Sequence, residues 1–291
     1  MARFIAEIGS NHNADAALAH ALIEASASAG CGAVKLQVFR VDDLFAPEAL
    51  ASEPQLNDRR AWEFPLEMLP DVQAQCRSAQ IELGATPFGL WAVEALADHV
   101  DFLKVASYEI LWHDLLRACV ATGKPVVLST GMATEDEVAR AVDSVDGALT
   151  LLHCVSGYPT PPEQANLAAI QTLRERFGCP VGWSDHTGLE AVVLQAVLRW
   201  DASDVELHVD LDGGGYEAGE HNWTPARVRT LQEAIARAEL VVDLALDGDG
   251  RKVPQPVELP DVAWRADPSD GLRPLRALRA GLGDQRAAQT S

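Results

Sequence analysis

The sequence lacks the features that mark several common classes of protein. None of its apolar runs reaches about 18 residues, the length that a membrane-spanning helix needs. Its first residues, MARFIAEIGS, show no basic segment followed by a long apolar one, so we expect a cytoplasmic protein without a secretion signal. The 5 cysteines are odd in number, widely spaced and without a C-x-x-C pair, which argues against structural zinc and a disulfide framework.

Positive charge is scarce as well. The chain has 23 Lys and Arg residues against 43 Asp and Glu, a formal net charge of −20, which argues against nucleic acid and anionic membranes as partners. A small anion remains a compatible ligand, because a binding site needs only local positive charge. The only lysines are Lys35, Lys104, Lys124 and Lys252. The first two fall inside apolar, strand-like runs, where lysine is unusual.

The pattern of apolar residues predicts a barrel. Short apolar runs alternate about eight times with segments of helical period, which is typical of a parallel sheet covered by helices. The predicted strands begin at Arg3, Ala33, Glu82, Phe102, Val126, Leu149, Val181 and Asp204. Eight such units in 291 residues favour one (β/α)8 TIM barrel, an α/β fold, over an open doubly wound sheet. No G-x-G-x-x-G follows the first strand, so a dinucleotide-binding fold is disfavoured.

Local signals place several boundaries. Residues 15–30 have the helical period that puts Ala19, Leu22 and Ile23, with Ala16, on one face. Thr134 and Glu137 have the spacing of a capping box at a helix start. Residues 41–65 are mixed and contain Pro47 and Pro54, so we expect an extended loop that acts as a lid or binding loop. We expect the barrel to occupy residues 1–247 and an irregular extension, with one short helix, to occupy 248–291.

Polar side chains collect where the predicted strands end. They are Glu7, Lys35, Gln37, Thr86, Lys104, Ser107, Glu109, Ser129, Ser156, Tyr158, Ser184, His186 and His208. In (β/α)8 barrels, catalytic residues come from the carboxyl ends of the strands. Two lysines and several hydroxyl groups at one rim predict a site for a small anion that bears phosphate and carboxylate. Simpler interpretations stand beside this one: Lys35 as a structural ion pair, the serines as helix caps, His153 as a core residue and the Asn-His-Asn run at 11–13 as a turn.

Two histidines suggest a metal. His186 and His208 are predicted at the ends of neighbouring strands, where two imidazoles can chelate one divalent ion and leave positions open for water and substrate. Asp185 and Glu206 flank them as candidate partners that would orient the rings. A plain histidine pair is the alternative.

Several motifs resemble the sialic acid synthase (N-acetylneuraminate synthase) family. The similarity runs in collinear order from about Phe4 to His208. The segments that carry it are EIGSNHN, ATPFG, KVASYE, GKPVVLSTGMAT, LLHCVSGYPTPPEQANLAAI and VGWSDHTG.

The resemblance implies a transferase that condenses phosphoenolpyruvate with the aldehyde of an N-acyl amino sugar or a related aldehyde, giving a 2-keto-3-deoxy acid and phosphate. It implies catalytic roles for Glu7, Lys35, Lys104 and His208, and manganese or magnesium bound by His186 and His208. It implies phosphoenolpyruvate binding by the two lysines with Thr86, Ser107, Ser129, Ser156 and Ser184. It also implies substrate contacts from Gln37, Tyr158, Glu109 and Glu220.

The sequence departs from the family's pattern in two places. We expect no C-terminal antifreeze-like domain, and LDGGGYEAGEHNWTP stands where the family has a Gly-Pro-Asp motif. Both departures concern the acceptor, so a different or smaller aldehyde is expected. The alternatives are a 3-deoxy sugar acid phosphate synthase and a non-catalytic barrel that binds phosphoenolpyruvate or a sugar. Small molecules are the expected partners, and a homodimer is compatible with the resemblance.

Overall fold

The computed structural model describes residues 2–212 and 219–242, together with 269, 275, 277 and 278. The chain divides into two compact units, Met1–Leu240 and Val241–Ser291. The predicted boundary after residue 247 and nearly all of the predicted extension at 248–291 lie outside the described residues. In the described part of the chain, no helix is long and apolar enough to cross a membrane.

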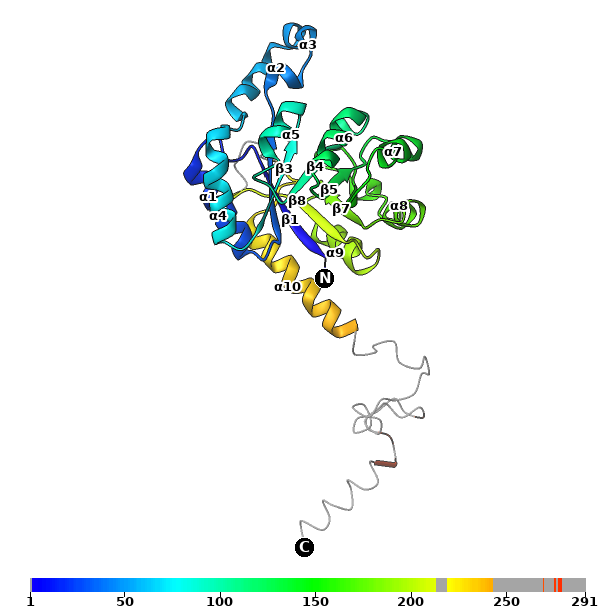
Figure 1. Ribbon diagram of the computed structural model, residues 1–291. Helices are drawn as coiled ribbons and strands as arrows, with labels where there is room; N and C mark the ends of the chain where they lie inside the picture. The colour runs from blue at the N-terminus through cyan, green and yellow to red at the C-terminus, as the bar shows by residue number, and fades with distance from the viewer. Residues whose placement is uncertain (1, 213–218, 243–268, 270–274, 276, 279–291) are drawn as a thin grey trace. The chain divides into compact units, whose positions relative to one another are not determined.

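Eight parallel strands pair in chain order, and the first pairs with the last, so the sheet closes into a barrel (Figure 1). The strands are β1 (Arg3–Gly9), β2 (Ala33–Val38), β3 (Glu82–Pro87), β4 (Phe102–Val105), β5 (Val126–Ser129), β6 (Leu149–His153), β7 (Val181–Asp185) and β8 (Asp204–His208). Each begins at its predicted residue, and the predicted (β/α)8 TIM barrel is confirmed. Near-continuous apolar runs could form this sheet because helices cover its outer face.

The helices that surround the barrel are α1 (Ala16–Ser28), α4 (Leu69–Ser78), α5 (Leu90–Leu96), α6 (His113–Ala121), α7 (Glu135–Val142), α8 (Ala169–Phe177), α9 (Glu190–Leu198) and α10 (Pro225–Val242). Asp15 is the N-cap of α1, and its side chain accepts hydrogen bonds from two backbone N–H groups. Thr134 and Glu137 form the predicted capping box of α7. All five cysteines are free, and only Cys179 is partly exposed.

The prediction of an extended loop at 41–65 is wrong. The segment forms α2 (Val41–Leu44), α3 (Pro47–Ser52) and the 3-10 helix η1 (Pro54–Trp62), and a further 3-10 turn, η2 (Leu66–Met68), follows. Figure 1 shows α2 and α3 standing away from the barrel at the top of the view. Pro47 and Pro54 lie in the first turns of α3 and η1, where the missing backbone N–H would have no partner within the helix. They therefore start helices here, although their presence suggested a loop.

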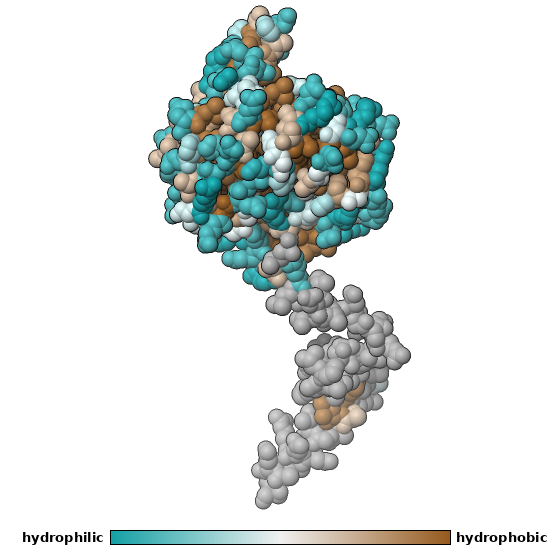
Figure 2. Space-filling view, in the orientation of Figure 1, coloured by the Kyte–Doolittle hydropathy of each residue, from teal (hydrophilic) through white to brown (hydrophobic). Residues whose placement is uncertain are grey.

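The middle of the barrel interior is apolar. Ile5, Ala33, Phe102, Val127 and Leu152 form a small buried cluster inside the strands, separate from the large core between strands and helices. A Cβ at Gly84 would lie 2.1 Å from Cζ of Phe102, so glycine is required beside this ring. All five residues come before the carboxyl ends of their strands, which leaves those ends for polar side chains. The barrel's outer surface is mostly hydrophilic (Figure 2).

Candidate active site

A cavity of about 60 Å³ lies at the carboxyl ends of the strands. Its walls include eleven predicted site residues: Glu7, Lys35, Gln37, Thr86, Lys104, Ser107, Ser129, Tyr158, Ser184, His186 and His208. Glu206, Cys154, Phe88, Ala106 and Tyr108 complete the lining. A larger cavity of about 300 Å³ lies between α7 and α8 and shares Cys154 with the first. The smaller cavity is the candidate site, because it gathers the buried charges.

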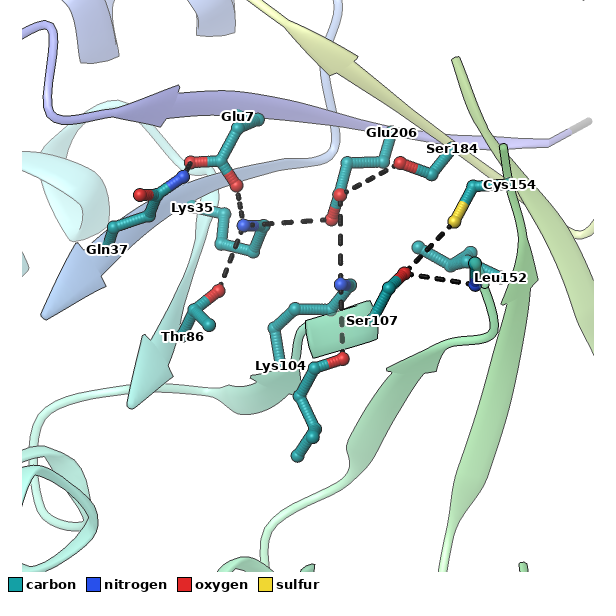
Figure 3. Close-up of polar contacts among 12 residues, drawn as sticks. Glu7, Lys35, Gln37, Thr86, Lys104, Ser107, Leu152, Cys154, Ser184 and Glu206 are labelled. Atoms are coloured by element: carbon teal, nitrogen blue, oxygen red, sulfur yellow. Dashed lines mark hydrogen bonds and ion pairs between the residues drawn. The ribbon is translucent and has the colours of Figure 1, made fainter. Parts of the chain in front are cut away.

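One side of the cavity, here called the lysine half, consists of Glu7, Lys35, Thr86, Lys104, Ser107, Ser129 and Glu206 (Figure 3). Lys35 and Lys104 are only 3% and 2% exposed. Lys35 forms an ion pair with Glu7, its neighbour in strand register, and donates to Thr86 Oγ1 over 3.0 Å. Buried lysines persist only where carboxylates and acceptors compensate for lost hydration. The two lysines are therefore buried because nearby carboxylates and hydrogen-bond acceptors compensate for their lost hydration.

The Glu206 carboxylate lies between the two lysines. Its oxygens are each 3.9 Å from an ammonium nitrogen, one of Lys35 and one of Lys104, and Ser184 Oγ donates to it over 3.1 Å. Burial alone would raise the pKa of Glu206, but Lys104 and then Lys35 hold it well below its ordinary value. Glu206 is therefore ionised at neutral pH.

Hydroxyl groups surround the backbone of Gly131 beside the lysines. Ser107 Oγ accepts from Gly131 N over 3.0 Å and lies 3.3 Å from Cys154 Sγ. A Cβ at Gly131 would lie 2.4 Å from Ser156 Oγ and 2.8 Å from Ser107 Oγ. Ser156 is not part of the cavity lining, but this closeness brings it to the same cluster. Hydroxyl and backbone N–H donors close to two ammonium groups are suited to phosphate or carboxylate oxygens.

The other side of the cavity is here called the histidine half. Gln37, Tyr158, His186 and His208 line it, and His221 packs against the rings of Tyr158 and His208. The ring centroids of His186 and His208 lie 5.3 Å apart, and those of His208 and His221 lie 5.4 Å apart. The Tyr158 ring lies 4.2 Å from that of His186. Gln37 reaches towards the lysine half and donates to Glu7 Oε1 over 3.4 Å. The tyrosine and histidine rings pack against one another, and the histidine rings carry nitrogens that can act as ligands.

The two predicted metal ligands suit a divalent ion. His186 Nδ1 lies 2.7 Å from the Val155 carbonyl, which can only accept, so Nδ1 is protonated and Nε2 keeps its lone pair. Burial, and next the nearby His208, lower the pKa of His186 to about 3, so the ring is neutral as a ligand must be. Among residues 2–212 and 219–242, no group of three or more His, Cys, Asp or Glu side chains is arranged to hold a metal. The neutral His186 ring is compatible with a ligand role, and metal binding by His186 and His208 stays a prediction.

Glu109 lies outside the cavity lining but near the lysine half. It is partly buried on the turn after β4, and its Oε2 accepts no hydrogen bond from any described residue. Burial raises the pKa of Glu109 to about 7, against the opposing effect of Lys104. Its predicted contact with substrate stays a prediction.

Glu220 is exposed and is not part of the cavity lining, so its predicted contact with substrate stays a prediction. Its neighbour His221 is buried against the rings of His208 and Tyr158. Two other assignments from the sequence need correction. Glu206, expected as a partner of the histidines, pairs with the lysines. Asp185 accepts from the indole N–H groups of Trp183 and Trp223, so it supports the loop after β7.

The strand period could have separated Glu206 from Asp185. Side chains two apart in a strand share a face, so Ser184 on the inside puts Asp185 on the outside. Glu206 is directly opposite Ser184 in the register of β7 and β8. Its place inside the barrel therefore follows from the same rule.

Several simpler interpretations are settled by the geometry. His153 Nε2 bonds to the Ala165 carbonyl over 3.0 Å, as a core histidine would. His12 Nδ1 accepts from Ala14 N, so the Asn-His-Asn run is a turn. Ser107, Ser129 and Ser184 are not N-caps of the described helices whose caps are defined. Lys35 does form an ion pair, but within the cavity.

Fold and site together define a (β/α)8 barrel with two buried lysines and a histidine pair at the carboxyl ends of its strands. The NeuB family model matches residues 22–245, and the chain belongs to the NeuB family.

Relatives and solved structures agree with this membership. The chain is 33% identical to N,N'-diacetyllegionaminic acid synthase of Legionella pneumophila over 277 residues, 88% of this chain and 76% of that one. It is 31% identical to N-acetylneuraminate-9-phosphate synthase of Drosophila melanogaster, over 81% of this chain and 68% of that one. The crystal structure of N-acetylneuraminic acid synthetase from Leptospira borgpetersenii, in complex with citrate, matches with a TM-score of 0.77 and 30% identity, covering 90% of each chain.

Proposed function

We propose that this protein is a transferase that condenses phosphoenolpyruvate with an aldehyde sugar to give a 2-keto-3-deoxy acid and phosphate. The observation that carries the proposal is the pair of buried lysines beside the hydroxyl cluster at Gly131, facing a histidine pair across one cavity. The names of the family members above, synthases of nine-carbon acid sugars, support the same reaction class.

The lysine half binds phosphoenolpyruvate in this proposal. Lys35 and Lys104 compensate the charge of its phosphate and carboxylate, Ser107 and Ser156 donate hydrogen bonds, and the N–H of Gly131 holds the Ser107 hydroxyl in place. C3 of phosphoenolpyruvate forms the new bond to the aldehyde carbon, water adds at C2, and phosphate leaves as its bond to C2 breaks. The lysines stabilise the leaving group because they face it before the reaction begins.

The histidine half binds the acceptor. His186 and His208 would hold manganese or magnesium, which acts as a Lewis acid that polarises the aldehyde oxygen. The Tyr158 ring packs at a tilt against His186 and is 48% exposed, so it can contact the sugar at the cavity mouth. Gln37 bonds to Glu7, which places an amide and a carboxylate at the boundary between the two substrates.

The test is phosphate release from phosphoenolpyruvate by the purified protein. The aldehydes to compare are N-acetylmannosamine, its 6-phosphate and a diacetamido hexose, each with manganese or magnesium and with or without EDTA. Release that depends on an aldehyde and is abolished by EDTA supports the proposal and identifies the acceptor. A preference for the 6-phosphate would favour a sugar phosphate synthase. Binding of phosphoenolpyruvate without release from any acceptor would favour a non-catalytic barrel.

A further inference from the structure

Glu206 occupies the position between the two lysines of the site (Figure 3). Its Oε2 lies 3.9 Å from Lys35 Nζ and its Oε1 lies 3.9 Å from Lys104 Nζ. Ser184 Oγ fixes the carboxylate with a hydrogen bond of 3.1 Å, and the residue is 4% exposed. One carboxylate therefore faces two ammonium groups that come from different strands.

These distances separate attraction from hydrogen bonding. At 3.9 Å a charge pair attracts strongly in a buried site, but the separation is too long for a hydrogen bond. Glu206 thus holds the ammonium groups without using their N–H donors. Lys104 Nζ donates to the Val105 carbonyl over 3.3 Å, and an ammonium group has three donors. Donors therefore remain for a ligand.

Burial of the Glu206 carboxylate is itself energetically unfavourable. Oε2 of Glu206 is buried and accepts no hydrogen bond from any residue that the structure describes. A buried acceptor of this kind is destabilising unless it serves another purpose. The Glu206 carboxylate supplies a negative charge to Lys104, which has no other ion pair within 4.0 Å in the described ranges.

We propose that Glu206 is a positioning residue of the lysine half, an inference that rests on the proposed function. Its negative charge keeps Lys35 and Lys104 on either side of the donor position, where they stabilise the departing phosphate. The same charge weakens binding of the anion in the ground state. Positioning for the transition state and weak ground-state binding together favour turnover.

This arrangement predicts opposite effects on binding and turnover. Glu206→Gln keeps the shape and removes one negative charge, so anions should bind about tenfold more tightly. Lys35 keeps its ion pair with Glu7, but Lys104 loses the counter-charge that holds it in place, so kcat should fall about 100-fold. Glu206→Asp keeps the charge but withdraws it by one methylene, so kcat should fall without tighter anion binding.

The measurement has two arms. Titration calorimetry with inorganic phosphate, in EDTA, gives the affinity of the lysine half without metal or turnover. Steady-state kinetics of phosphate release give kcat and KM for phosphoenolpyruvate. Glu82→Gln is the matched control, because it makes the same change in net charge at an exposed ion pair with Arg3 at the strand start. We expect it to leave both arms unchanged.

Thermal unfolding of each variant accompanies both arms. Tighter phosphate binding together with a lower kcat in Glu206→Gln, with neither change in Glu82→Gln, supports the inference. Equal or weaker phosphate binding or an unchanged kcat in Glu206→Gln overturns it, as does tighter binding by Glu82→Gln to the same degree. If the wild-type protein releases no phosphate with any aldehyde, the proposed function fails. The phosphate titration still decides the role of Glu206.

Discussion

The lysine half and the histidine half share one cavity but are built differently. Lys35 and Lys104 project from strands, are almost fully buried and are held by Glu7 and Glu206. Tyr158 and His221 follow strands β6 and β8 in loops, and Tyr158 is 48% exposed. Strand register and ion pairs thus fix most of the half that we assign to phosphoenolpyruvate, whereas loops supply Tyr158 and His221 to the half that we assign to the acceptor. A shared donor and a variable acceptor suit such a division, because loops change without disturbing the barrel.

The largest expected effect is that of Lys104→Ala. Loss of this charge leaves Glu206 without one of its two lysines and removes a group that faces the phosphate. We expect phosphate release to fall about 1000-fold, measured as kcat/KM for phosphoenolpyruvate. Lys124→Ala, just before β5 at the opposite end of the barrel, is the control and should keep full activity. Full activity of Lys104→Ala would show that the donor site is elsewhere.

A smaller, selective effect is expected of Tyr158→Ala. Loss of the ring that packs against His186 should raise KM for the aldehyde about tenfold and leave KM for phosphoenolpyruvate within about twofold. Tyr158→Phe keeps the ring and should lose less. A matching rise in KM for phosphoenolpyruvate would contradict the division into two halves.

The smallest effect concerns stability at the edge of the lysine half. The pKa of Glu109 is raised to about 7, so the native state binds this proton more tightly than the unfolded state does. Its contribution to the free energy of unfolding is fully present below about pH 4.5 and is lost as pH rises through about 7.

Glu109→Gln tests this by removing the titration. The wild-type protein should lose about 2 kcal/mol relative to Glu109→Gln between pH 5 and pH 8 in urea unfolding, after allowance for partial exposure. Glu94→Gln, on an exposed face of α5, should show the same dependence of unfolding free energy on pH as the wild type. Parallel curves for wild type and Glu109→Gln would mean that the carboxyl is hydrated in solution.

The barrel and most of the site could be predicted from the sequence. The strand starts followed from apolar runs, and the capping box of Thr134 and Glu137 from spacing alone. The polar residues at the strand ends were correctly grouped because parallel strands in a barrel end on one side. The helices at 41–65 were missed, since Pro47 and Pro54 read equally as loop residues or as first residues of helices.

What the sequence determined by itself is the set of groups at one rim: two lysines, their hydroxyl neighbours and two histidines. Only the tertiary structure decided which groups pair. Lys35, Lys104 and Glu206 are far apart in the chain and meet because closure of the sheet brings β2, β4 and β8 around one axis. Likewise His221, and not Glu220, joins the histidine half, because the loop buries one of two adjacent side chains. Sequence spacing gives the face of a strand or helix, but distances across a barrel depend on closure and on the loops.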